Sequence, residues 1–104
     1  MQIKDKLYIN GAWVAPSVST TIDVFNAGTG AVMGRIPAAA EADMNAAVAA
    51  ARAAFDVWSQ TSVATRADFL NKISAGLKAR SDELAKCIVQ EVGTPIKMAS
   101  RIQA

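Results

Sequence analysis

The hydrophobic pattern changes its period once along the chain, near residue 40. Before that point, short apolar runs alternate with turn residues, beginning with Leu7–Ile9 and Ala12–Val14 on either side of Asn10-Gly11. Asn-Gly favours a two-residue hairpin turn, because both central residues of a type I′ turn need positive φ. The sequence therefore predicts a β-hairpin here. A second strand pair is predicted at residues 22–25 and 31–36, across the turn residues 26–30.

After residue 40 the apolar residues recur every three to four positions, which places them on one face of a helix. The first helix is expected to begin at Glu41 and to bury an Ala-rich face. Its N-terminus has Ala40 where serine or threonine would cap, although Glu41 and Asp43 suit the positive end of the helix dipole. The residues expected on the buried face are Met44, Val48, Ala51, Phe55 and Trp58.

A second helix is predicted to start after Ser62, with Leu70, Ile73 and Leu77 facing inward, to pause at residues 80–83 and to continue to Val92. The next three residues fit a helix-ending glycine, an N-cap and a first-turn proline, so a third helix is expected. Its apolar positions are still in phase where the sequence stops, which we interpret as a cut chain. These last signals are Gly93, Thr94, Pro95, Ile96, Ala99 and Ile102.

Composition excludes several classes of protein. A chain of 104 residues allows one domain at most, and its net charge of +2 is spread along the chain, which argues against nucleic acid as a partner. The absence of histidine excludes an imidazole base and a histidine metal site. One cysteine cannot form an internal disulfide, and no apolar run reaches the ~20 residues of a membrane span. We expect a cytoplasmic protein with no membrane partner.

Two sequence features resemble reactive or binding motifs. Cys87 lies in the predicted helix beside its buried stripe, far from a helix N-terminus, so a packing role is favoured over a nucleophile. The spacing of the three glycines in residues 28–34 resembles that of a dinucleotide-binding loop. Such a loop must be followed by a helix N-terminus that binds the phosphates, whereas a strand is predicted after these glycines. They are interpreted as turn residues.

The acidic residues give one further candidate. The pairs at residues 41–43 and 82–83 each stand at a helix start, where the dipole alone favours carboxylates. Glu91 lies in a largely apolar stretch next to a helix end. It is the one acidic residue for which capping, pairing with a lysine and holding a cation all stay open.

Four blocks of the sequence together form a distinctive series. They are residues 7–14 (LYINGAWV), 25–30 (FNAGTG), 44–58 (MNAAVAAARAAFDVW) and 91–95 (EVGTP). Taken in this order, they are similar to the N-terminus of the NAD(P)-dependent aldehyde dehydrogenase family, and the resemblance covers essentially the whole chain. The chain departs from the family at Ala27, where proline is usual after the asparagine, and near Val63 and Thr65, where the family has a proline and a glutamate.

The resemblance implies an α/β parent enzyme in which residues 1–104 form the N-terminal part of the cofactor-binding domain, an incomplete domain with hairpins over about residues 6–36 and helices over about 41–104. The parent would oxidise an aldehyde to a carboxylic acid with NAD or NADP, through a cysteine nucleophile and a glutamate base that both belong to motifs beyond residue 104. Cys87 does not match that nucleophile. The chain alone is expected to have no catalytic residue, to bind no cofactor and to be inactive.

The resemblance also implies a monovalent-cation site in some members. Backbone carbonyls at positions that match Val24 and Phe25, with the acidic residue that matches Glu91, would hold the ion. A homo-oligomer is expected as well, because isolated helices associate to hide their apolar faces. The alternative to the enzyme segment is a freestanding helical interaction module that buries Phe55, Trp58 and Leu70 against a partner.

Overall fold

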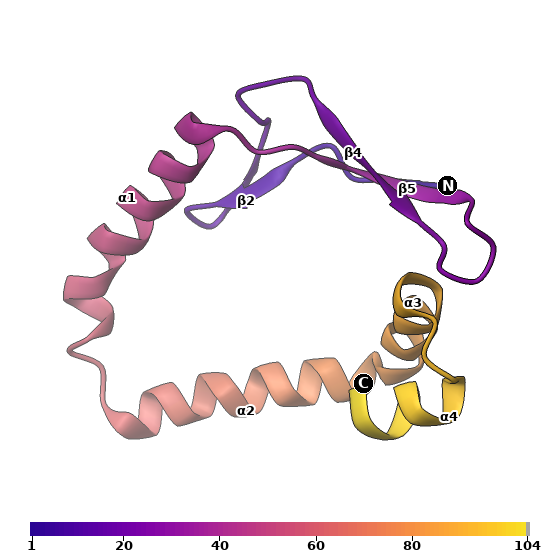
Figure 1. Cartoon of the computed structure of the whole chain (residues 1–104). Coiled ribbons are helices and arrows are strands. Elements are labelled where there is room, and N and C mark those ends of the chain that lie inside the picture. The colour runs from indigo at the N-terminus through magenta and orange to yellow at the C-terminus, as the bar shows by residue number, and fades with distance from the viewer. Residues whose placement is uncertain (104) are drawn as a thin grey trace. The chain divides into compact units, whose positions relative to one another are not determined.

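The chain consists of two compact units, which we describe separately (Figure 1). The computed structural model describes residues 1–103, and side chains as far as Arg101. The first unit comprises residues 1–24 and 32–60, and the second comprises residues 25–31 and the chain from Thr61 onward. Strands belong mainly to the first unit and helices to both, so the expected order of hairpins followed by helices is confirmed.

The first hairpin forms as the Asn-Gly signal predicts. Strands β2 (Leu7–Ile9) and β3 (Ala12–Val14) pair antiparallel, with Ile9 opposite Ala12. Asn10 and Gly11 have φ of 53° and 76°, so both turn residues occupy the left-handed region that a type I′ turn requires. On one face the rings of Tyr8 and Trp13 lie 5.1 Å apart at 59°, a tilted aromatic pair across the strands.

The second strand pair forms one side of a three-stranded sheet that includes a strand missed by the sequence analysis. Strands β4 (Thr21–Phe25) and β5 (Val32–Pro37) pair with each other, and β1 (Gln2–Ile3) adds to the far edge of β5 in parallel. The Lys4 N–H extends the pairing by donating to the Arg35 carbonyl at 2.9 Å. Gly34 is buried where β1 passes, and a Cβ there would lie 2.8 Å from the Gln2 carbonyl oxygen.

Helix α1 (Glu41–Trp58) is anchored at its start by Asp43. One carboxylate oxygen accepts the Ser17 N–H at 2.9 Å, and the other accepts the Ser17 hydroxyl at 2.8 Å and the Ala40 N–H at 2.9 Å. Asp43 therefore satisfies the Ala40 N–H from within the helix and also ties the helix to the link before β4. The sequence analysis saw only a dipole role for this residue, because Ser17 lies 26 positions away and gives no local signal.

This anchor makes the first unit sensitive to acid. The Ala40 N–H, followed by the Ser17 hydroxyl, holds the pKa of the Asp43 carboxyl below its ordinary value, and burial opposes them. Since the folded-state pKa is the lower one, the stabilisation is complete above the unfolded pKa of about 4 and is lost as pH falls through the folded value. We expect Asp43→Asn to flatten the dependence of α1 melting on pH below about 4. Circular dichroism against pH measures this; Asp56→Asn in the same helix is the control and should melt with the pH dependence of the unmodified chain.

The second unit contains the remaining helices. Helix α2 (Val63–Ala79) begins at Ser62, whose hydroxyl oxygen accepts the Thr65 N–H at 3.1 Å, as an N-cap does. The predicted pause falls at Arg80, which separates α2 from α3 (Ser81–Val92) and binds Glu83 through two hydrogen bonds of 2.9 and 2.7 Å. Helix α3 ends at Gly93, whose φ of 79° confirms the predicted helix-ending glycine.

The third helix starts one residue later than the sequence predicted. Pro95, not Thr94, is the N-cap of α4 (Ile96–Met98), since its carbonyl accepts the N–H groups of Met98 and Ala99. The last turn widens into the π-helical segment η1 (Ala99–Gln103). A proline has no N–H to lose at this position and its φ of −56° already suits a helix start, so the two neighbouring positions were hard to distinguish from sequence. The expected inward position of Ile102 lies outside the side chains that the structure describes.

The turn between β4 and β5 packs on α3 within the second unit. Asn26 organises the turn, because its side-chain oxygen accepts the N–H groups of Gly28 and Thr29 at 2.9 and 3.1 Å. The Ala27 N–H then donates to the Gln90 carbonyl at 2.7 Å. Since α3 lies about 60 residues beyond the turn, this bond is a long-range link that no local pattern indicates.

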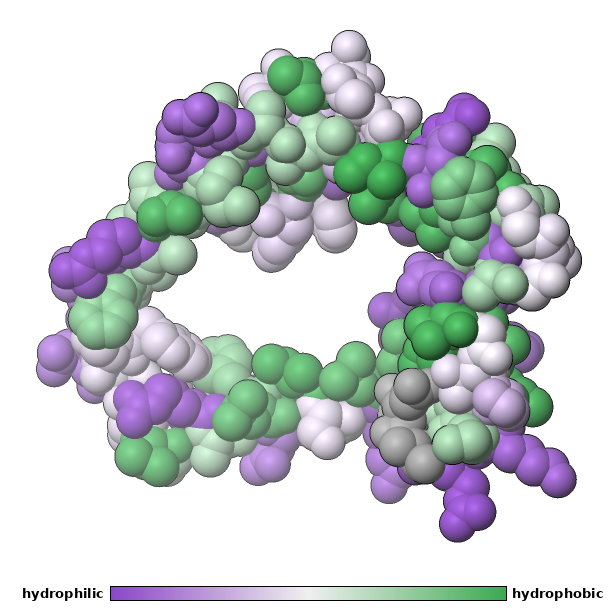
Figure 2. Space-filling model, in the orientation of Figure 1, coloured by the Kyte–Doolittle hydropathy of each residue, from purple (hydrophilic) through white to green (hydrophobic). Residues whose placement is uncertain are grey.

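The expected burial of the helical faces is wrong for the described chain. Among side chains as far as Arg101, only Ala85 and Ala99 are buried apolar residues, where α3 meets η1, and no large side chain is fully buried. Hydrophobic residues lie instead along the surface of the helices (Figure 2). Periodicity specifies which face a helix can bury, but neither unit supplies the covering surface. The stripe residues that are more than half exposed are Met44, Val48 and Phe55 on α1 and Leu70, Ile73 and Leu77 on α2.

Candidate functional site

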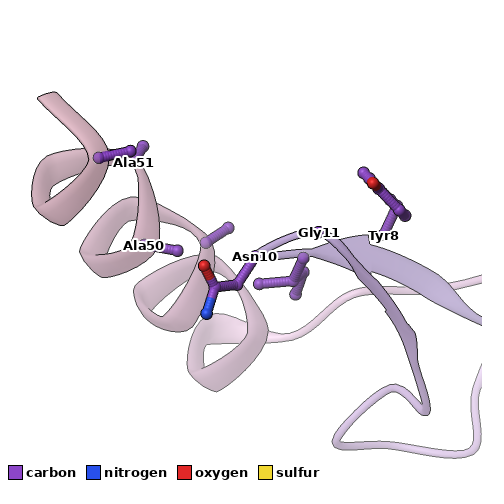
Figure 3. Close-up of a pocket in the computed structure, with 8 residues that line it drawn as sticks. Tyr8, Asn10, Gly11, Ala50 and Ala51 are labelled. Atoms are coloured by element: carbon purple, nitrogen blue, oxygen red, sulfur yellow. The ribbon is translucent and has the colours of Figure 1, made fainter. Parts of the chain in front are cut away.

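A shallow depression lies between the first hairpin and α1, within the first unit. Its volume is about 330 Å³, and the tip of the hairpin and a row of alanines line it (Figure 3). Alanine side chains let the hairpin approach the helix backbone closely. The polar side chains that line the depression are the Tyr8 phenol and the Asn10 amide. Its lining residues are Tyr8, Ile9, Asn10, Gly11, Ala47, Ala50, Ala51 and Ala54.

Cys87 is exposed on α3, which corrects the expectation that it borders a buried stripe. Partial burial, followed by the nearby Glu91 carboxylate, raises the pKa of the thiol, and Glu83 adds to the effect. A nucleophilic cysteine needs the opposite, a pKa lowered by a cation or a helix N-terminus. The raised pKa of Cys87 is unfavourable for thiolate formation, and the absence of a nucleophilic role stays a prediction.

The glycines of residues 28–34 serve the turn and the sheet, as the sequence analysis interpreted them. Gly30 has a φ of 72° in the turn, and Gly34 lies within β5 against β1. Strand β5 follows the turn directly, so the segment does not have the strand–loop–helix order on which a dinucleotide-phosphate loop depends.

The acidic residues do not gather into a metal centre in the described part of the chain. Among residues 1–103, no three Cys, Asp or Glu side chains come close enough together to hold a metal ion. The acidic pairs stand in the first turns of α1 and α3, as expected. Asp43 is committed to Ser17 and Ala40, which leaves it unavailable as an acid or base.

The predicted cation site involves both units. Val24 belongs to the first unit, whereas Phe25 and Glu91 belong to the second. Within the second unit, the 2.7 Å bond from Ala27 to Gln90 joins the segment after Phe25 to the residue before Glu91. Glu91 is exposed and interacts with Cys87 one helical turn earlier. The residue before Glu91 is therefore bonded to the turn, and the cation site stays a prediction.

The two small sheets, followed by helices, define the chain as an α/β segment. The aldehyde dehydrogenase family model matches residues 13–103 of the chain. The chain belongs to the aldehyde dehydrogenase family. The prediction made from its four sequence blocks is thereby confirmed.

Individual relatives agree with this assignment. The 3-succinoylsemialdehyde-pyridine dehydrogenase of a Pseudomonas species is 37% identical over 95% of this chain and 21% of its own length. The crystal structure of an aldehyde dehydrogenase from Bartonella henselae superposes with a TM-score of 0.95 at 37% identity and covers 99% of this chain and 22% of that one. Aldehyde dehydrogenase C of Pseudomonas syringae, solved as a mutant with NAD+ and octanal, gives 0.92 at 40% identity over 95% of this chain and 20% of that one.

The chain thus spans about a fifth of the length of the relatives that it matches. The high TM-scores show that its α/β segment has the same fold inside those longer enzymes, and they favour the enzyme segment over the freestanding helical module. No helix in residues 1–103 is both long enough and apolar enough to cross a membrane.

Proposed function

We propose that this chain is the N-terminal part of an NAD(P)-dependent aldehyde dehydrogenase that oxidises an aldehyde to a carboxylic acid. The observation that carries the proposal is the family match over residues 13–103. It is supported by the Pseudomonas syringae relative, whose structure holds NAD+ and octanal. When bound, the nicotinamide would accept a hydride from the substrate. The cysteine nucleophile and the glutamate base would come from later segments of the parent.

We propose a structural role for the segment itself, as the N-terminal part of the cofactor-binding domain. The exposed stripes of α1 and α2 support this role, because an apolar helical face of this size is normally covered. The remaining four-fifths of the parent would supply the cover. Residues 1–104 are then an incomplete domain, and the parent would act in the cytoplasm as a homo-oligomer.

The isolated chain is expected to have no dehydrogenase activity. Purified residues 1–104 should produce no NADH or NADPH from octanal and either nucleotide, because the pKa of the Cys87 thiol is raised and the family's nucleophile and base are expected beyond residue 104. Titration calorimetry with NAD and NADP should show no binding. The polypeptide extended through the downstream reading frame is the matched control and should reduce the nucleotide with octanal or another aldehyde.

Aldehyde-dependent reduction of the nucleotide by the isolated chain would overturn the structural role. An inactive extended polypeptide that folds, tested over a panel of aliphatic and aromatic aldehydes, would overturn the proposed activity. The two results are independent, so the experiment separates the role of the segment from the function of the parent.

A potassium site formed by the carbonyls of Val24 and Phe25 and by Glu91 is part of the proposal. Oxygen ligands suit a hard cation, and a carboxylate near the turn can supply one charge. Glu91→Ala in the extended enzyme should abolish the stabilisation that potassium gives to the unmodified enzyme, measured as the potassium-dependent shift in Tm. Glu83→Ala, on the same helix, is the control. Equal potassium shifts in all three proteins would rule the site out.

A further inference from the structure

We propose that Asn10 is a site of spontaneous deamidation, in which the backbone nitrogen of Gly11 displaces the side-chain amide. This modification is independent of the dehydrogenase reaction. It follows from the position of this asparagine at the exposed tip of the first hairpin, in front of the one glycine that follows an asparagine in the chain.

The local geometry leaves the reacting groups accessible. Both turn residues are exposed, and beyond the neighbouring residues Asn10 and Ala12 no heavy atom lies within 4 Å of the place where a side chain on Gly11 would begin. The Asn10 side chain lies at the hairpin tip next to Gly11 in Figure 3. Since the strand pairing ends at Ile9 and Ala12, the Gly11 nitrogen lies outside the ladder and is open to solvent base.

The attack needs a rotation about the Asn10 backbone that the closed turn does not favour. Each strand of this hairpin has only three residues, and a two-stranded hairpin is marginally stable. Brief opening of such a turn costs little free energy. Gly11 also allows this rotation of the Asn10 backbone more readily than another residue at its position would, because glycine lacks a Cβ.

The reaction balances with water as the only co-reactant. Gly11 N loses its proton and bonds to Asn10 Cγ, the Cγ–Nδ2 bond breaks, and ammonia leaves to give a cyclic imide. Water then opens the ring. Cleavage of the bond from nitrogen to Cγ gives an aspartate, and cleavage of the bond from nitrogen to the main-chain carbonyl gives an isoaspartate.

The other asparagines lack these conditions. Asn26 is held by the N–H groups of Gly28 and Thr29, and alanine follows it. Asn45 and Asn71 lie inside α1 and α2, where helical hydrogen bonds hold the next backbone nitrogen. Because Asn45 and Asn71 are also exposed, they serve as internal controls for solvent access.

Deamidation would alter the contact between the hairpin and α1. An isoaspartate inserts an extra backbone atom into a two-residue turn, which breaks the register that places Tyr8 opposite Trp13. Either product places a negative charge beside the alanines Ala47 and Ala50 that line the depression. Because Asn10 is exposed, this charge stays in contact with water, and the loosening of the hairpin is expected from the broken register.

The test is incubation of the intact chain in mildly alkaline heavy-oxygen water at physiological temperature, followed by digestion and mass spectrometry. The peptide with Asn10 should take up heavy oxygen at least about tenfold faster than those with Asn45 or Asn71, because glycine alone leaves the attack unhindered. Part of the product should be methylated by an isoaspartyl methyltransferase. Equal rates at the three asparagines would overturn the proposal.

A variant at Gly11 tests whether the Gly11 nitrogen or water attacks the side chain of Asn10. In Gly11→Ala the rate at Asn10 should fall, whether or not the turn keeps its conformation, because the added Cβ hinders attack in the folded and the open chain alike. An unchanged rate would overturn the proposal, since water would then hydrolyse the amide directly. Tryptophan fluorescence of the aged chain, compared with Asn10→Asp, reports separately on how each product changes the Tyr8–Trp13 pair.

Discussion

Replacing Gly34 by alanine is expected to release β1 from the sheet and to destabilise this part of the first unit by about 1–3 kcal/mol. The added Cβ would lie 2.8 Å from the Gln2 carbonyl oxygen, well inside contact distance. The atom that it meets belongs to the backbone, which cannot rotate away as the end of a side chain can. The parallel pairing of Gln2 with Gly34 and of Ile3 with Arg35 would be lost.

Amide hydrogen exchange at Lys4 measures this loss, because its N–H donates to the Arg35 carbonyl across the same pairing. Protection of Lys4 should fall about fivefold to a hundredfold, which corresponds to the expected 1–3 kcal/mol. A chain that lacks residues 1–4 is the decisive control. There the substitution should leave the exchange of β4 and β5 unchanged, because the clashing backbone is gone. Equal damage in both chains would show that the clash with Gln2 is not the cause.

Replacing Gly93 by valine should destabilise the C-terminal end of α3 by about 1–2 kcal/mol, because a side chain disfavours the left-handed conformation. The φ of Gly93 is 79°, and the nearest neighbour of an added Cβ would be Ala27 Cβ at 3.6 Å, an ordinary contact. Space is therefore adequate, and the cost comes from the backbone. The substitution should also weaken the bond from Ala27 to Gln90, three residues before the cap.

Gly76→Ala is the matched control, because Gly76 lies within α2 with open space around it. Its effect should have the opposite sign, a stabilisation of about 0.5–1 kcal/mol from the higher helix propensity of alanine. Urea denaturation followed by circular dichroism measures both variants. Gly93→Val with unchanged stability would mean that α3 can end without a left-handed residue.

Local signals in the sequence were sufficient for most of the elements. Asn10-Gly11 predicted the first hairpin, Ser62 the start of α2, and Gly93 the end of α3, because each residue acts on its own backbone. The interpretation of the glycines at residues 28–34 as turn residues was also predictable, since it depended only on the strand that follows the turn. The N-cap of α4 was predicted at Thr94, one residue too early, because the adjacent Pro95 satisfies the same backbone requirement.

Long-range contacts were not predictable from the sequence. Strand β1 has two residues and pairs with β5 some thirty positions away, so it carries no periodicity of its own. The bonds of Asp43 to Ser17 and of Ala27 to Gln90 likewise join distant segments. The stripes of α1 and α2 were correctly read as apolar faces but not as exposed ones, because burial depends on a covering surface that the pattern does not contain.

The most direct test of the central claim, that these residues begin an aldehyde dehydrogenase, is to read the gene beyond codon 104. The account predicts an open frame about four times as long again, as the relatives' lengths imply, with a glycine-rich nucleotide loop and a Gly-Gln-x-Cys nucleophile motif. A stop codon directly after codon 104, or an open frame without these motifs, would contradict it. The exposed stripes of α1 and α2 would then have to be covered by a separate protein.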